Sequence, residues 1–152
     1  MADQLDDLSS WLTPLISRLE PTERSKLARS LAQQLRRSQQ QRIIAQRNPD
    51  GSAFAPRKQR DLRGKAGRIK RKAKMFTKLR TARYIQARGN AAEATVSFAG
   101  RITRIARVHQ YGLRDRAEKG APDVQYAQRE LLGLSDTERA FIRDQLLAHL
   151  AN

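Results

Sequence analysis

The sequence contains one densely basic stretch, residues 57–80, which reads RKQRDLRGKAGRIKRKAKMFTKLR. Twelve of its 24 residues are Lys or Arg, and Asp61 is its single acid. The stretch therefore carries +11 of the chain's formal net charge of +16. A basic block of this density is often a contact surface for nucleic acid or an acidic partner, and the alternative is a solvated loop with no fixed partner.

The two halves of this stretch are expected to differ in structure. Gly64 and Gly67 interrupt the first half, which predicts a loop. From Ile69 to Leu79, apolar residues recur at helical spacing, which predicts an amphipathic helix. At 152 residues the chain is expected to form a single domain. Its three parts are a helical hairpin (1–47), a basic extended loop (48–68) and an α+β body (69–152).

Two helices are predicted before the basic stretch. Apolar residues at three- and four-residue steps predict the first over about residues 4–19, with Trp11 in the core and Pro14 as its kink or its start. The second is a long helix over about residues 22–46, with Pro21 at its beginning. Its middle, RRSQQQRII (36–44), is polar, which would allow its second half to leave the domain body.

A β-hairpin is predicted after the basic stretch. Residues 82–88 contain Tyr and Ile at a strand-favouring position, and residues 94–99 alternate apolar and polar side chains. The loop at 89–93 joins the two runs. Residues 113–124 are charged and indicate an exposed loop, and residues 124–127 are a candidate edge strand.

Two further helices complete the predicted fold. The first is short, covers residues 101–110 and stops at Gly112. The second covers residues 136–150, because Ser135 and Glu138 have the spacing of a capping box. Its inward side chains are expected to be Ile142, Leu146, Leu147 and Leu150.

The predicted fold class is α+β. It consists of an N-terminal helical hairpin with a long second helix, a small antiparallel β-hairpin or sheet, a short helix, and a C-terminal helix packed on the sheet. The absence of cysteine excludes disulfides, thiolate zinc sites and a Cys nucleophile, and fits a reducing compartment. No apolar run approaches the roughly 18 residues of a membrane span. The acidic N-terminus does not have the pattern of a signal peptide.

The sequence contains no recognisable catalytic constellation. The two histidines, His109 and His149, are 40 residues apart. We expect His149 to complement the dipole of the last helix and His109 to have a structural hydrogen-bonding role. The glycines at 64–67 lack the frame of a phosphate-binding loop, and the acids lack metal-site spacing. We therefore expect no enzymatic activity, no metal and no cofactor.

The basic stretch also lacks the marks of a specific nucleic-acid reader. Phe76 is its single aromatic, so it has no stacking platform for a single strand. The helix pairs do not match a helix-turn-helix register, and a chain without cysteine cannot form a zinc finger of the usual kind. Contact with DNA through charge alone, or with an acidic protein surface, remains open.

Four segments, in their order and spacing, together resemble one family. They are QQQRIIAQRNPDGSAFAPRK (39–58), RIKRKAKMFTKLRTARYI (68–85), IARVHQYGL (105–113) and QYAQRELLGLSDTE (125–138). The family is the phage virion morphogenesis family, also called the tail completion protein S family, of temperate phages with contractile tails. The resemblance covers about residues 22–150. Residues 128–130, Gln-Arg-Glu, depart from the family pattern, which has a second proline and an aromatic residue there.

The resemblance implies a structural virion protein. It implies a protein that completes the tail at its head-proximal end, enables head–tail joining, and forms a ring, expected to contain six copies, around the DNA channel. Its expected partners are other tail, tail-terminator and neck or connector proteins, after assembly in the host cytoplasm. The alternative is a nonspecific nucleic-acid-binding protein acting through residues 57–80. The candidate assembly or DNA-channel contacts are Arg57, Lys58, Arg60, Arg63, Lys65, Arg68, Lys70, Arg71 and Lys72.

The charge of the chain is also unevenly placed. Residues 1–23 contain five acids and one arginine and carry −4, whereas the middle of the chain is strongly basic. Complementary patches of this kind suit head-to-tail assembly of identical copies, because a ring needs one surface to bind a different surface on its neighbour.

Overall fold

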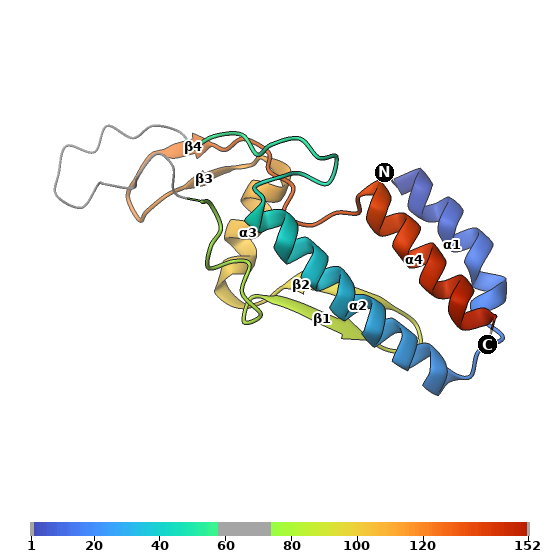
Figure 1. The fold of residues 1–152 in the computed structure, drawn as a ribbon. Coiled ribbons are helices and arrows are strands. Elements are labelled where there is room, and N and C mark those ends of the chain that lie inside the picture. Colours follow the sequence, from blue (N-terminus) through green and yellow to red (C-terminus); the bar gives the residue numbers. More distant parts are fainter. Residues whose placement is uncertain (1, 58–73, 152) are drawn as a thin grey trace.

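The structure is a computed structural model, and it describes residues 2–57 and 74–151. It confirms the predicted α+β class, with helices at one end and two small β-hairpins (Figure 1). The elements are α1 (Ala2–Ile16), α2 (Pro21–Ile44), β1 (Ile85–Gly89), β2 (Ala94–Phe98), a 3-10 turn (Gly100–Ile102), α3 (Thr103–Tyr111), β3 (Arg114–Arg116), β4 (Asp123–Gln125) and α4 (Asp136–Leu150).

Helix α2 is the element against which the others pack. Its 24 residues have no internal Gly or Pro after Pro21 at the start, and most are strong helix formers. The β1–β2 hairpin lies along it (Figure 1). The closest approach is at Gly89, where a Cβ would lie 2.4 Å from the backbone nitrogen of Arg29. Only glycine permits this contact between helix and strand.

The β1–β2 hairpin confirms the strands predicted after the basic stretch. Its antiparallel register runs from Ile85 opposite Phe98 to Gly89 opposite Ala94. In the connecting loop, the side chain of Asn90 accepts hydrogen bonds from two backbone N–H groups, at 2.8 and 2.9 Å. This local turn closes the hairpin at the end that packs on α2.

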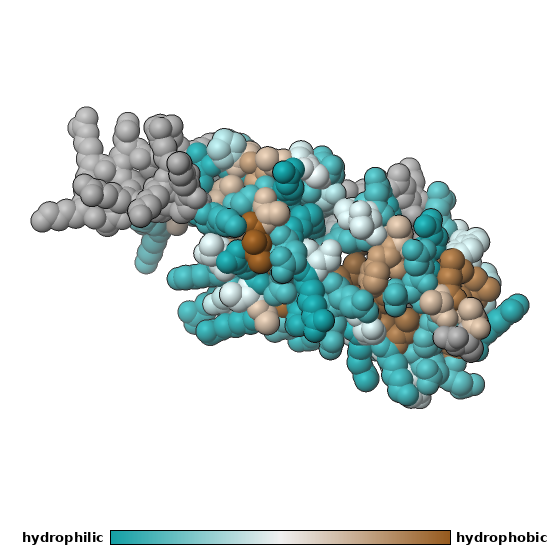
Figure 2. All heavy atoms as spheres, in the orientation of Figure 1, coloured by the Kyte–Doolittle hydropathy of each residue, from teal (hydrophilic) through white to brown (hydrophobic). Residues whose placement is uncertain are grey.

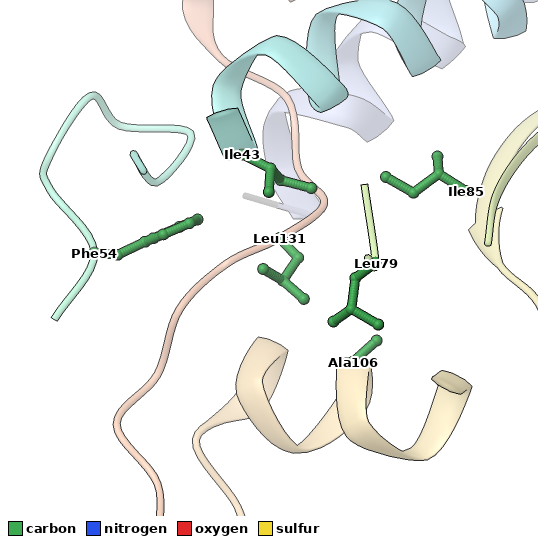
Figure 3. Close-up of a cluster of buried hydrophobic side chains, with 6 residues drawn as sticks. All are labelled: Ile43, Phe54, Leu79, Ile85, Ala106 and Leu131. Carbon is green, nitrogen blue, oxygen red and sulfur yellow. The ribbon is translucent and has the colours of Figure 1, made fainter. Parts of the chain in front are cut away.

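Two apolar clusters form the core, and α2 contributes to both. The first contains Leu12 of α1, Leu31 of α2 and Leu146 of α4. The second lies at the other end of α2 and gathers one side chain from each of six segments, shown in Figure 3. Its buried members are Ile43, Phe54, Leu79, Ile85, Ala106 and Leu131. Helix α2 thereby joins the helical end of the molecule to the β end.

The packing of the helices corrects three predictions. Helix α2, and not the C-terminal helix, covers the sheet, while α4 packs beside α1 and α2. Trp11 is 51% exposed, and Leu147 also lies at the surface. Apolar periodicity identified a helix face but not how much of that face the partner helix would cover. The polar second half of α2 stays in the body, because Gln39 and Ile43 are buried.

The end of the basic stretch differs from its predicted helix. Residues 75–80 form bends and turns, and Phe76 has a φ of 65°, which a right-handed helix cannot contain. Residues 69–73 lie outside the described part of the chain. The region predicted as an exposed loop, 113–124, contains part of a second hairpin, in which Arg114 pairs with Gln125 and Arg116 with Asp123. Charged side chains on both strands gave no apolar alternation to indicate it.

The last two helices end and begin as predicted. Gly112 closes α3 with a φ of 62°, the left-handed conformation that glycine adopts without steric cost. The hydroxyl of Ser135 accepts from the backbone N–H of Glu138, and the Glu138 carboxylate accepts from the N–H of Ser135 at 2.8 Å. Helix α4 therefore begins at the predicted capping box.

Replacing Gly89 tests the packing of the hairpin on α2. We expect Gly89→Ala to lower the free energy of unfolding by about 2–3 kcal/mol, because the new methyl group must displace helix backbone. Gly120→Ala is the matched control, because its Cβ meets nothing within 4 Å. Its positive φ should cost only about 1 kcal/mol. Urea unfolding measures both variants, and equal losses would contradict the close helix–strand contact.

Candidate assembly surface

Of the nine candidate contact residues, one lies in the described part of the chain and eight lie outside it. Arg57 is described and exposed. Its Nη2 donates to the carbonyl oxygen of Lys74 at 3.3 Å, so the two residues that flank the undescribed segment contact each other. The other eight candidates lie outside the described residues. They are Lys58, Arg60, Arg63, Lys65, Arg68, Lys70, Arg71 and Lys72.

The end of α2 holds the second flank of this segment. The Gln46 side chain donates to the carbonyl of Met75 at 3.0 Å and accepts from its N–H at 2.8 Å. Gln46 itself has a φ of 57°, which turns the chain directly after the helix. A side-chain amide that pairs with both backbone groups of one residue acts like a strand partner, and it fixes the position of Met75 relative to α2.

Arg129 holds the first flank. It is only 4% exposed, and it lies in the three residues that depart from the family pattern. Its Nε donates to the carbonyl of Ala55 at 2.7 Å, and its Nη2 donates to that of Pro56 at 2.8 Å. Burial lowers the pKa of Arg129, and the charge of Arg57 lowers it further. The guanidinium thus fixes the chain immediately before the basic segment.

His109 lies beside Arg129 in an aromatic environment. Its ring is edge-on to Phe76 at 4.8 Å and to Tyr126 at 5.0 Å between centroids. Its Nδ1 is 3.3 Å from Nη1 of Arg129. Burial, with the Arg129 charge as the second cause, lowers the pKa of His109 to about 4. The neutral ring accepts from the guanidinium, which confirms the predicted structural hydrogen bonding.

A second polar network joins α2 to the start of α4. Glu138 is 5% exposed, and its Oε1 accepts from the Ser38 hydroxyl at 2.6 Å and from the Gln39 amide at 2.9 Å. The Gln39 amide also donates to the Gly133 carbonyl at 2.7 Å. Arg42 donates to carbonyls in the same segment and to the Gln39 side chain. Burial lowers the pKa of Arg42, while Glu138 and Glu130 oppose that shift.

This network explains the polar run that the sequence placed in the middle of α2. The side chains of Ser38, Gln39 and Arg42 satisfy the backbone of residues 130–133 and the buried carboxylate of Glu138. A buried carboxylate is costly unless it is hydrogen-bonded and compensated, and both conditions are met here. The polar residues therefore fix tertiary structure, and do not form a solvated extension.

A basic groove lies between α3 and the β3–β4 hairpin. We call it the α3 groove; its volume is about 630 Å³, and Ile105, 48% exposed, contributes apolar surface to it. Residues 101–123 contain six basic and three acidic residues, so the region is net basic. An ion pair between Arg104 and Asp115 joins the two walls. The lining is Arg101, Arg104, Ile105, Asp115, Arg116, Ala117, Glu118, Lys119 and Gly120.

Sequence reasoning did not identify this groove. The signal for one wall was present, because Arg101 and Arg104 are three residues apart at the start of a predicted helix. The other wall is the β3–β4 hairpin; β3 and the turn after it were predicted as loop, and residues 124–127, which overlap β4, as a candidate edge strand. Without that hairpin, the arginines had no second surface with which to form a concave site.

The described residues contain no cluster of metal-binding side chains and no helix of the membrane-spanning kind. Within residues 2–57 and 74–151, no group of three or more His, Asp or Glu side chains could hold a metal ion. In the same ranges, no helix is both long and apolar enough to cross a membrane. The buried polar side chains described above are bonded to backbone groups and to one another, an arrangement that holds segments in place.

Comparison with known proteins agrees with the resemblance found in the sequence. The model of the phage virion morphogenesis family matches residues 3–151, and the chain therefore belongs to this family. The chain is also similar to the tail completion protein S of Escherichia phage P2. It is 43% identical over 140 residues, which cover 91% of this chain and 92% of the relative. No solved structure matches the chain.

The depressed pKa of His109 predicts a pH-dependent stability. Between pH 6.5 and about 4, the unfolded chain binds a proton at this ring and the folded chain does not. The contribution of His109 to the free energy of unfolding is thus fully present above pH 6.5, and it is lost as the pH is lowered through this window. After allowance for solvent screening, we expect a loss of about 1 kcal/mol between pH 7 and 5.

Urea unfolding at the two pH values measures this contribution by comparing variants. His109→Gln should reduce the pH-dependent loss, whereas His149→Gln, at a partly exposed position on α4 away from the His109 ring, should retain it. An unchanged pH dependence in His109→Gln would show that protonation of His109 is not opposed by the folded state.

Proposed function

We propose that this chain is a structural protein of a contractile-tailed phage virion that completes the tail at its head-proximal end and enables head–tail joining. The observation that carries the proposal is the match with a protein named for tail completion. The two chains correspond over more than nine-tenths of each. A relation over the whole length supports a shared role better than one shared motif would.

The proposed working form is a homo-oligomer, namely a hexameric ring around the DNA channel of the neck. Its neighbours would be other tail, tail-terminator and connector proteins, and it would reach the virion after assembly in the host cytoplasm. Charge supports this form, because residues 1–23 are acidic and the middle of the chain is basic. A closed ring requires such unlike surfaces to meet between neighbouring copies.

The proposed role of the basic segment is contact with a neighbouring ring or with the DNA in the channel. Its flanks support this role, since Arg129 fixes residues 55–56 and Gln46 fixes Met75. The two flanks of the segment therefore meet at one place, the Arg57–Lys74 contact.

The proposal assigns no enzymatic activity and no cofactor to the chain. Three buried polar residues support this. The Gln39 and Glu138 side chains bond to each other and to backbone groups, and Arg129 bonds to backbone carbonyls. A catalytic acid or base needs access to a substrate, and groups that are engaged in this way do not have it.

The alternative function is nonspecific nucleic-acid binding through residues 57–80. The +11 charge of this stretch favours it. Charge-driven binding would lose roughly 10³–10⁵ in affinity between 50 and 200 mM salt if most of the nine candidate residues contacted phosphates. Duplex DNA binding by the purified chain measures this, with a variant that has all nine replaced by Gln as control. Absence of binding at low salt would reject the alternative and leave tail completion standing.

Tail completion is tested by electron microscopy of particles from a phage that lacks this protein. We expect heads and tails that remain separate, with joined particles restored when the wild-type chain is supplied in the host. The nine-residue Gln variant serves as the comparison, and should restore few joined particles. Normal head-attached tails in the absence of the protein would overturn the proposed function.

A further inference from the structure

The outer face of α1 has the character of an interface and not of a solvated helix. Asp7, Trp11 and Pro14 recur at steps of four and three residues, so they lie on one side of the helix, and all three are exposed. Trp11 is the single Trp of the chain. Aromatic side chains are enriched at protein interfaces, where their large area is buried without much loss of conformational freedom.

The surroundings of this face support that reading. In Figure 2, apolar side chains gather over the helices at the α1–α4 end, whereas hydrophilic ones cover most of the rest of this view. Leu147 of the neighbouring helix α4 is also exposed. Asp6 and Asp7 add negative charge beside Trp11. The partner of this face should therefore combine apolar surface with positive charge.

The α3 groove has this combination. Ile105 lines it and is 48% exposed, so it supplies apolar surface. Arg101 and Lys119 are exposed at the lining and supply positive charge. Helix α3 and the β3–β4 hairpin, which line the groove, lie toward the opposite end of the molecule from α1 (Figure 1). A chain therefore does not place α1 in its own groove.

We propose that α1 of one copy docks in the α3 groove of the next copy, head to tail. In this contact Trp11 packs against Ile105, and Asp6 and Asp7 face Arg101 and Lys119. The proposal rests on the proposed function, because it supplies the repeating interface of the ring. An interface between two unlike surfaces continues from copy to copy and closes when the rotation permits it.

A second copy suits the groove better than nucleic acid does. Four cations and two carboxylates line it, so its net charge is small, whereas binding to a duplex relies on many contacts between cations and phosphates. Ile105 offers apolar area that a duplex backbone does not use. An acidic helix with an exposed Trp matches both features of the groove. The Trp can pack on Ile105, and the acidic side chains can pair with the excess arginine and lysine.

Cross-linking tests the docking directly, because the chain has no cysteine of its own. A full-length variant with Asp7→Cys and Lys119→Cys is treated with a short bismaleimide, in solution and on assembled tails. We expect a ladder of covalent oligomers at a yield about tenfold above a control with Asp7→Cys and Arg88→Cys, since Arg88 is an exposed cation outside the groove. Equal yields, or no ladder in either setting, would overturn the docking.

Charge exchange provides the second test. One variant carries Asp6→Lys with Asp7→Lys, and the other carries Arg101→Glu with Lys119→Glu. Each alone should need about a hundredfold higher concentration to associate in sedimentation velocity, because like charges then face each other. An equimolar mixture should regain association, since each reversed surface meets an opposite one. All four substitutions are on exposed residues, and thermal unfolding checks that both variants fold.

The outcomes separate the docking from the proposed function. If a mixture of the two variants stays dissociated, or if each variant alone associates like the wild type, the docking is wrong. Plaque formation by the phage lacking this protein is scored in parallel with the wild-type chain supplied. Restored plaques with failed charge exchange reject the docking alone, whereas wild-type failure to restore plaques rejects tail completion.

Discussion

The carboxylate of Glu138 is the point on which the arrangement of the molecule depends. It accepts hydrogen bonds from Ser38 and Gln39 of α2 and from the N–H of Ser135 at the start of α4. Arg42 lies close enough for its charge to compensate the carboxylate. A buried carboxylate that loses such partners destabilises a fold by several kcal/mol, so this cluster specifies how α4 and residues 130–133 sit on α2.

The consequences of this cluster extend to both ends of the molecule. Toward the N-terminus, α2 and α4 are held in the positions that let Leu31 and Leu146 bury Leu12 of α1. Toward the other end, residues 130–133 are preceded by Arg129, which donates a hydrogen bond to the carbonyl of Ala55, just before the basic stretch. Helix α2 therefore sets the distance between an acidic end and a basic end. In head-to-tail assembly each copy would use these two ends to contact its neighbours, so their spacing matters for the interface.

Local signals in the sequence predicted the elements well, and tertiary contacts account for the errors. The Ser135 capping box, the long second helix and the first hairpin follow from nearest-neighbour chemistry. The predicted helix at 69–79 is wrong in its described part, because Phe76 adopts a positive φ while packing on Phe54 and His109. Charge identified the basic candidates, of which Arg57 is described. The α3 groove depends on a charged hairpin that apolar periodicity does not reveal.

A double-mutant cycle on Gln39→Ala and Glu138→Ala measures the central contact most directly. Urea unfolding should give a coupling free energy of about 1–3 kcal/mol between the two side chains. Ser135→Ala, which removes only the cap hydroxyl, should cost about 1 kcal/mol and separates the capping contribution. Additive losses within about 0.5 kcal/mol would contradict a buried network that joins α2 to α4.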